Sequence, residues 1–187
     1  MPGLVFGLIL FGSGMALTVR ADLGLTPWFV FHQGLAAHIP LSIGLITIVV
    51  SMVLLLAWIP LRQRPGIGTI LNATVVGVVI DLILFLVGET DLLWLQIFYL
   101  VGGIGLVAIG SGLYIGARLG PGPRDGIMTG LAERGLSIRL ARTLIEGTVL
   151  VAGWLLGGAV GVGTVVFTIT IGPLIQPVLR RADKGPI

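Results

Sequence analysis

The sequence predicts an all-α membrane protein with six transmembrane helices, arranged as 3+3 inverted repeats that each carry a short re-entrant or interfacial half-helix. Three observations lead to this prediction: the composition, an internal repeat and the placement of the arginines. Hydrophobic residues make up 56% of the 187 residues and charged residues only 10%, and the mean hydropathy is +1.11. A soluble domain of this length could not keep so much apolar surface from water. We therefore expect residues 1–187 to form a single membrane domain.

The internal repeat divides this domain into two halves. The stretch FGSGMALTVRADLGLTPWFVFHQGLA near the amino terminus aligns with IGSGLYIGARLGPGPRDGIMTGLA in the second half, apart from two extra residues in the first copy. Further matches follow in the same order: LSIGL with LSIRL, Trp58 with Trp154, and GIGT with GVGT. The alignment predicts that repeat one covers about 4–88 and repeat two about 100–180.

Each repeat contains three long apolar runs and one shorter segment that opens with proline. A bilayer core needs about 20 apolar residues in a helix, and roughly 17 is the practical minimum. The short segments fall below that minimum, so each is predicted to be a half-helix that enters or lies on the membrane without crossing it. The predicted spans are 4–19, 41–60, 67–88, 93–117, 138–157 and 162–179, and the predicted half-helices are 27–38 and 123–134.

The arginines set the orientation. With the amino terminus in the cytoplasm and six crossings, every basic residue except Arg20 lies on the cytoplasmic side, as the positive-inside rule requires. Eight crossings would leave a basic cluster outside in either orientation. Because three spans per repeat is an odd number, the second repeat is inverted and both termini are cytoplasmic. Many secondary transporters are built in this way, with a substrate site where the repeats meet.

The candidate substrate-binding residues surround the starts of the two half-helices. Pro27 and Pro123 are predicted at the first helical position, with Thr26 and Gly122 as N-caps. Free N–H groups and the helix dipole attract an anionic group such as a carboxylate or phosphate. Two arginines of this region have an alternative role, which is to extend toward lipid headgroups from helix ends; they are Arg20 and Arg118. The full candidate set is Arg20, Thr26, Pro27, Arg118, Gly122, Pro123, Arg124 and Asp125.

Two acids inside apolar runs are candidates for a coupling site. Glu146 lies four residues after Arg142, so it either carries a coupling proton or forms a static ion pair on one helical face. Asp81 lies in NATVVGVVIDLILFLVG with no basic residue nearby in sequence. It is either a proton or cation site or a hydrogen-bonded structural residue.

Other classes of function lack the residues that they need. The chain has no cysteine, and no histidines or carboxylates have the spacing of a metal site, so neither a metal nor another cofactor is expected. The two GSG motifs have no base within reach, and GPGP is not followed by the Lys-Ser/Thr of a phosphate loop, so we do not expect an enzyme. The arginines are not interleaved with aromatic residues, which argues against nucleic acid. Small residues at every fourth position serve packing within the chain or in a homodimer.

Several stretches resemble one known family. LGLTPW, HQGLA, GIGTILN, LGPGPRDGIMTGL, RTLIEG, GGAVGVGT and IGP are similar to motifs of the YczE/YitT-like bacterial integral membrane proteins, within the YczE-like branch. The resemblance covers nearly the whole chain and implies a bacterial cytoplasmic (inner) membrane protein, but it implies no substrate. In that family an aspartate often follows the proline-tryptophan of the first repeat. Here Phe29 stands at that position and only Asp125 remains, which weakens a symmetric two-acid site.

These observations lead us to expect a small secondary transporter or exporter of an organic anion or zwitterion, in which one repeat rocks against the other. Arg118 and Arg124 would hold the anionic group at the helix start, and Asp125 would orient Arg124. Asp81 or Glu146 would be the coupling site. The alternative is a non-transporting membrane module that binds a lipid headgroup or a partner membrane protein. Membrane lipids are expected partners in both cases.

Overall fold

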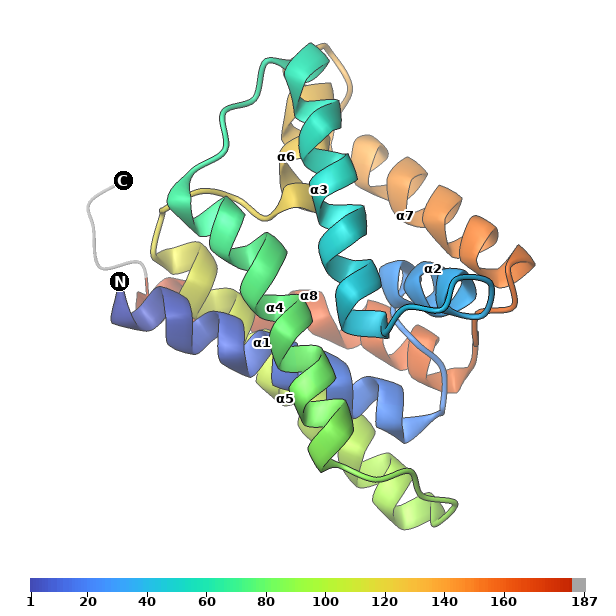
Figure 1. Cartoon of the computed structure of the whole chain (residues 1–187). Helices are drawn as coiled ribbons and strands as arrows, with labels where there is room; N and C mark the ends of the chain where they lie inside the picture. The colour runs from blue at the N-terminus through green and yellow to red at the C-terminus, as the bar shows by residue number, and fades with distance from the viewer. Residues whose placement is uncertain (183–187) are drawn as a thin grey trace.

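In the computed structural model, residues 1–182 are described, and they form eight α-helices without a strand (Figure 1). Every predicted span and half-helix corresponds to one of them, with ends that differ by a few residues. The short helices are α2 (Pro27–Ala36) and α6 (Pro123–Ala132). The long helices are α1 (Pro2–Ala21), α3 (Ile43–Leu61), α4 (Ile67–Leu86), α5 (Leu93–Gly116), α7 (Ile138–Leu155) and α8 (Val162–Ala182).

Five helices of the described chain are long and apolar enough to cross a membrane: α1, α3, α4, α5 and α8. Their outer faces carry exposed apolar side chains such as Phe85 and Phe98, as contact with lipid requires. The chain is therefore a multi-pass membrane protein. The sixth predicted span, α7, is not among the five, because Arg139, Arg142 and Glu146 lie in its sequence.

The half-helices begin where the sequence predicts. Pro27 and Pro123 lie in the first turn, and the N-caps Thr26 and Gly122 have extended backbone conformations. The Thr26 hydroxyl accepts a hydrogen bond from the Phe29 N–H at 3.4 Å, which satisfies one of the free donors of the first turn. The serine of the repeated LSI motif caps α3 and α7 in the same way. The two repeats thus start their equivalent helices with equivalent chemistry.

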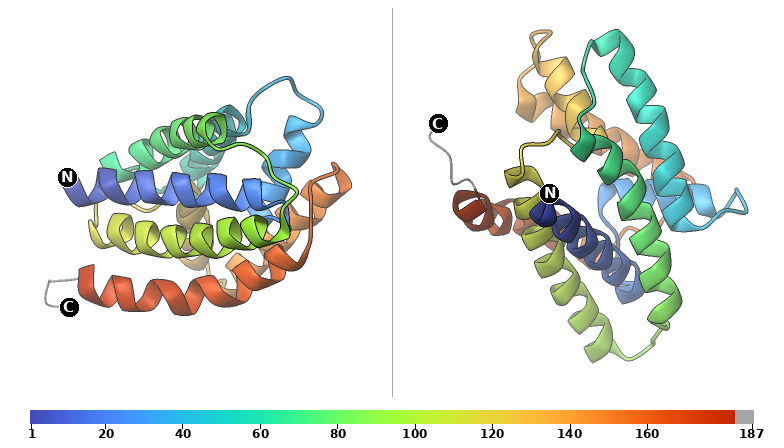
Figure 2. Two further views of the ribbon diagram at one scale, coloured as in Figure 1. Left: turned by 90° about the horizontal axis from the view of Figure 1, so that it is seen from below. Right: turned by 60° about the vertical axis from the view of Figure 1, so that its left-hand side comes forward.

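The first helices of the two repeats, α1 and α5, lie side by side (Figure 2). They meet through glycines: a Cβ on Gly7 would lie 2.9 Å from the Gly110 carbonyl oxygen, and one on Gly14 would lie 2.6 Å from the Gly103 carbonyl oxygen. The small residues therefore allow close packing inside the chain. Residue numbers rise along α1 as they fall along α5 at these contacts, so the two helices run antiparallel.

Each half-helix packs against a helix of the other repeat. Half-helix α2 packs on α7, and half-helix α6 packs on α3, so each lies against a long helix of the other repeat (Figure 1). Within each repeat, by contrast, the last helix packs on the first: α4 on α1 and α8 on α5. The short helices are therefore held between the two halves of the molecule.

The repeated GIGT and GVGT motifs join the repeats. Gly68 N–H at the start of α4 donates to the Leu119 carbonyl at 2.8 Å, and Gly163 N–H at the start of α8 donates to the Leu23 carbonyl at 2.6 Å. In both cases the acceptor belongs to the loop that precedes the half-helix of the other repeat. The Thr69 hydroxyl adds a bond of 2.8 Å to the Pro121 carbonyl. These bonds fix the loops from which the half-helices start.

The repeats differ in how their last two helices pack. In repeat one α3 lies along α4, with Gly44 directly against Gly77. In repeat two the equivalent helices α7 and α8 make almost no contact over their described residues. A Cβ on Gly172, the counterpart of Gly77, would meet open space. One repeat is thus closed at this position and the other is open.

Candidate functional site

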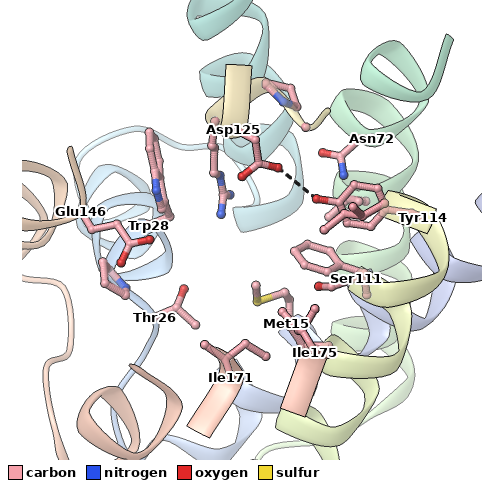
Figure 3. A pocket seen from close by; sticks show the side chains of 18 of the residues that line it. Met15, Thr26, Trp28, Asn72, Ser111, Tyr114, Asp125, Glu146, Ile171 and Ile175 are labelled. Atoms are coloured by element: carbon pink, nitrogen blue, oxygen red, sulfur yellow. Dashed lines mark hydrogen bonds between the residues drawn. The ribbon is translucent and has the colours of Figure 1, made fainter. Parts of the chain in front are cut away.

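A cavity of about 210 Å³ lies between the starts of the two half-helices and the helices α1, α3, α4, α5, α7 and α8 (Figure 3). Both repeats contribute to its wall. Asp125, Tyr114 and Asn72 lie on one side and Met15 and Ile171 on the opposite side, with the polar side chains of Thr26, Ser111 and Glu146 between them. The cavity is therefore amphiphilic and has room for a small molecule.

Six of the eight candidate substrate-binding residues line this cavity. They come from the first turns of α2 and α6 and their N-caps, which the exchange of half-helices brings to the same place although they are far apart in sequence. These residues are Thr26, Pro27, Gly122, Pro123, Arg124 and Asp125.

Arg124 lines the cavity and lies beside the start of α2. Its guanidinium carbon lies 4.9 Å from the ring centroid of Trp28 and 5.8 Å from that of Phe29, which are cation–π distances. Within the described residues, the guanidinium forms no hydrogen bond and no ion pair. Its five N–H donors therefore remain available to a bound group. Trp28, on which it stacks, is the residue that aligns with Arg124 in the repeat.

Asp125 is held by a tyrosine. The Tyr114 hydroxyl donates to Asp125 Oδ2 at 3.2 Å. The expectation that Asp125 orients Arg124 has no counterpart among the hydrogen bonds and ion pairs of the described residues. Asp125 lies in the first turn of α6, where a carboxylate is stabilised by the helix dipole. The first turn of α2 carries no acid, because Phe29 occupies the equivalent position.

Glu146 and Arg142 face the cavity as a pair. Arg142 Nε lies 2.9 Å from Glu146 Oε1 across one helical turn, and both residues line the cavity. Of the two alternatives for Glu146, the contact matches the static ion pair. The lining thus contains two cationic and two anionic side chains, and one pair of them is already neutralised.

The other candidates among the described residues lie outside the cavity lining. Arg20 forms an ion pair with Glu89 at 2.8 Å and donates to the Leu84 carbonyl, which ties the end of α1 to the end of α4. Arg118 follows α5 in the left-handed conformation with φ 51°. Both arginines belong to the ends of long helices, one loop away from the site.

Asp81 forms hydrogen bonds to the start of a neighbouring helix. Its carboxylate accepts hydrogen bonds from the Gly44 N–H at 2.9 Å and from the Ser42 hydroxyl at 2.5 Å. These groups belong to the start of α3, so Asp81 on α4 caps a neighbouring helix. The contacts correspond to the structural alternative for this acid.

Two buried groups beside the site lack hydrogen-bond partners in the described structure: Trp28 Nε1 and His32 Nε2. The Thr47 hydroxyl lies 2.8 Å from the Ile43 carbonyl and 2.9 Å from His32 Nδ1. Because the hydroxyl has one proton, donation to Ile43 makes Nδ1 the donor to Thr47. His32 Nε2 is then an acceptor, four residues from the unpaired Trp28 donor. Sequence reasoning missed both residues, although the alignment of Trp28 with Arg124 was a usable signal.

Trp58 anchors the half-helix that carries the charges. Its Nε1–H donates to the Pro123 carbonyl at 2.9 Å, and its ring lies directly on Gly126, where no side chain separates the two helices. The equivalent residue of repeat two, Trp154, is exposed. The anchor therefore exists in one repeat only.

Comparison with known proteins identifies the relatives of this chain. The family described as "Family of unknown function (DUF6198)" matches residues 1–180. An uncharacterized protein of Haemophilus influenzae is 38% identical over 184 residues, which is 98% of this chain and 84% of that protein. The uncharacterized membrane protein YczE of Bacillus subtilis is 34% identical over 174 residues, 91% of this chain and 80% of its own length. The uncharacterized protein YyaS of Bacillus subtilis is 31% identical over 186 residues, 94% of this chain and 91% of its own length. No solved structure matches.

Proposed function

The chain belongs to the family of unknown function DUF6198 and is a YczE-like membrane protein, as its motifs predicted, and from this premise we propose that it is a small secondary transporter. Its substrate is an organic anion or zwitterion that binds in the cavity between the half-helices. It resides in the bacterial cytoplasmic membrane with six spans and both termini in the cytoplasm.

The observation that carries this proposal is the Arg124 guanidinium. It lines a cavity built from both repeats, stacks on aromatic rings and has no hydrogen-bond or ion-pair partner within the described residues. An arginine without a partner is costly in a membrane interior, and such residues mark substrate paths. A guanidinium in this state is suited to a carboxylate or phosphate, which it binds through two parallel N–H groups.

The packing supports an inverted repeat. Equivalent helices of two repeats run antiparallel when the repeats are related by an axis in the membrane plane, and α1 and α5 do so at their glycine contacts. The exchange of α2 and α6 between repeats follows the same symmetry. The charges of α7 are compatible with a sixth span, because Arg142 and Glu146 pair with each other beside the cavity.

The difference between the repeats supports movement. In an inverted-repeat transporter one repeat rocks against the other around a fixed site. Here α3 and α4 are in contact while α7 and α8 are apart. Exchange of these two arrangements would bring α7 onto α8 and separate α3 from α4. The open space at Gly172 leaves room for that approach.

The test is the accessibility of the cavity from each side of the membrane. The chain has no native cysteine, so single cysteines report cleanly. Ser111→Cys places a thiol in the cavity lining, and Ser13→Cys places one at the aligned position of repeat one, outside that lining. We expect a small, charged, membrane-impermeant thiol reagent to label Ser111→Cys in both right-side-out and inside-out vesicles, and Ser13→Cys in neither.

Labelling of Ser111→Cys from one side only would refute alternating access. The protein would then be a binding module, and lipid that co-purifies with it would be the next ligand to identify.

A further inference from the structure

Resting on the proposed transport function, we propose that the substrate is a small zwitterion with an apolar side group, of the α-amino-acid type. Its carboxylate binds Arg124 at the start of α2, its ammonium group binds Asp125 at the start of α6, and its side group lies against the apolar wall.

The first step is the balance of charge in the cavity. Arg142 and Glu146 neutralise each other at 2.9 Å. Among the described lining residues this leaves one cation, Arg124, and one anion, Asp125, neither of which has an ion partner. A simple anion would neutralise Arg124 but would add negative charge beside Asp125. A zwitterion supplies the missing partner for both, which a site of low dielectric strongly favours.

The second step is the asymmetry of the two helix starts. Asp125 already places a carboxylate in the first turn of α6, so the positive end of that helix dipole is compensated. The first turn of α2 has no acid, because Phe29 occupies the equivalent position. The Arg124 guanidinium lies over Trp28 and Phe29 in this same turn. The start of α2 with Arg124 is therefore the anionic subsite, and Asp125 with Tyr114 is the cationic subsite.

The third step is the apolar wall. Met15, Ile171 and Ile175 lie across the cavity from Asp125 (Figure 3). These side chains offer no partner to a polar group but favour the burial of an apolar one. A cavity of about 210 Å³ limits the ligand to a small molecule. A compact head with both charges and a short apolar body fits this distribution.

The experiment compares three probes that differ only in their charges: L-leucine, 4-methylpentanoate, which lacks the ammonium group, and 3-methylbutylamine, which lacks the carboxylate. Glycine serves as a fourth probe without the apolar body. The melting temperature of the purified full-length protein is measured against the concentration of each. We expect L-leucine to bind roughly tenfold or more tightly than each of the others. The two probes with a single charge each leave a charged group of the site without its partner, and glycine leaves the apolar wall without a side group to bury.

Two variants test the assignment of the subsites. Asp125→Asn keeps the shape of the side chain and an acceptor for Tyr114. It is expected to weaken L-leucine binding at least tenfold while 4-methylpentanoate binds as well as before or better. Arg124→Gln is expected to abolish the binding of both. Asp91→Asn and Arg64→Gln, at exposed positions, are the matched controls and should bind all probes like the parent.

The outcomes separate this inference from the transport function. Binding of 4-methylpentanoate with equal or higher affinity than L-leucine would overturn the zwitterion and leave an anion transporter. Binding of 3-methylbutylamine alone, or of no probe, in a protein whose Ser111→Cys is labelled from both sides would also overturn the zwitterion and leave transport standing. One-sided labelling would refute transport itself, whatever the probes do.

Discussion

Replacement of Trp58 by phenylalanine tests whether repeat one positions the charged half-helix of repeat two. Trp58 is 1% exposed, donates to the Pro123 carbonyl at 2.9 Å and lies on Gly126. Trp154, its counterpart, is 63% exposed. The same substitution at the two positions therefore removes an anchor in one case and an exposed ring edge in the other.

The expected magnitude follows from what is lost. The hydrogen bond contributes about 0.5–1.5 kcal/mol net. Phenylalanine also has two fewer buried ring carbons, at about 0.8 kcal/mol each. Trp58→Phe should thus lower the free energy of unfolding by about 2–3 kcal/mol, or roughly 4–12 °C in melting temperature for a chain of this size. Trp154→Phe should change it by less than about 0.5 kcal/mol.

The assay is a thermal melt of both variants in detergent, followed by titration with L-leucine. Since Pro123 precedes Arg124 directly, a loosened first turn of α6 should also weaken ligand binding in Trp58→Phe and not in Trp154→Phe. Equal melting shifts for the two variants would refute the role of Trp58 as an anchor. A destabilised Trp58→Phe that still binds ligand like the parent would show that the anchor supports the fold and not the site.

Three further substitutions and one control test the packing and the assigned contacts. Gly103→Ala should destabilise the protein by about 1–3 kcal/mol, because its Cβ would lie 2.8 Å from a backbone oxygen of α1. The control is Gly102→Ala, whose Cβ would meet open space, so that this variant should be neutral or stabilised by up to about 1 kcal/mol. Similar melting temperatures for the two variants would contradict the glycine contact. Asp81→Ala should cost about 1–2 kcal/mol as a lost cap and leave ligand affinity unchanged; a loss of affinity would restore the coupling role. Glu146→Gln should destabilise the protein by about 1–3 kcal/mol, because it leaves the Arg142 guanidinium beside the cavity without its ion partner; an unchanged melt would show that the pair does not stabilise α7.

The helices could be predicted because their boundaries are local. Apolar runs of helical length alternate with proline and glycine, and Pro27 and Pro123 mark both half-helix starts. Because the repeat aligns these two starts, the sequence predicted that they form one binding site, and six of the candidate residues line the cavity. Arg20 and Arg118 were grouped with them by closeness in sequence. They lie elsewhere because a loop separates the end of each long helix from the half-helix that follows.

The contacts of the site could not be predicted in the same way, because they join distant segments. Arg124 stacks on Trp28, and Trp58 bonds to Pro123, because each half-helix packs against the other repeat. Tyr114 carried no motif, so its bond to Asp125 had no signal in the sequence. The sequence also predicted α7 as a sixth span, whereas α7 is not among the five helices that are long and apolar enough to cross a membrane, because it carries Arg139, Arg142 and Glu146.

The distribution of chemistry between the repeats bears on mechanism. The repeats keep the same scaffold, with proline-started half-helices, serine caps and glycine-threonine junctions. The charged residues that line the cavity, by contrast, all come from α6 and α7 of repeat two, whereas repeat one supplies uncharged lining residues such as Trp28, Thr47 and Asn72. Although α6 and α7 contact each other, α6 also packs on α3 and α7 packs on α2 of repeat one, and Trp58 of α3 bonds to the start of α6. Each charged helix is therefore held by a helix of the other repeat, and rocking of the repeats would shift α6 relative to α7 and change the arrangement of charges around a bound zwitterion.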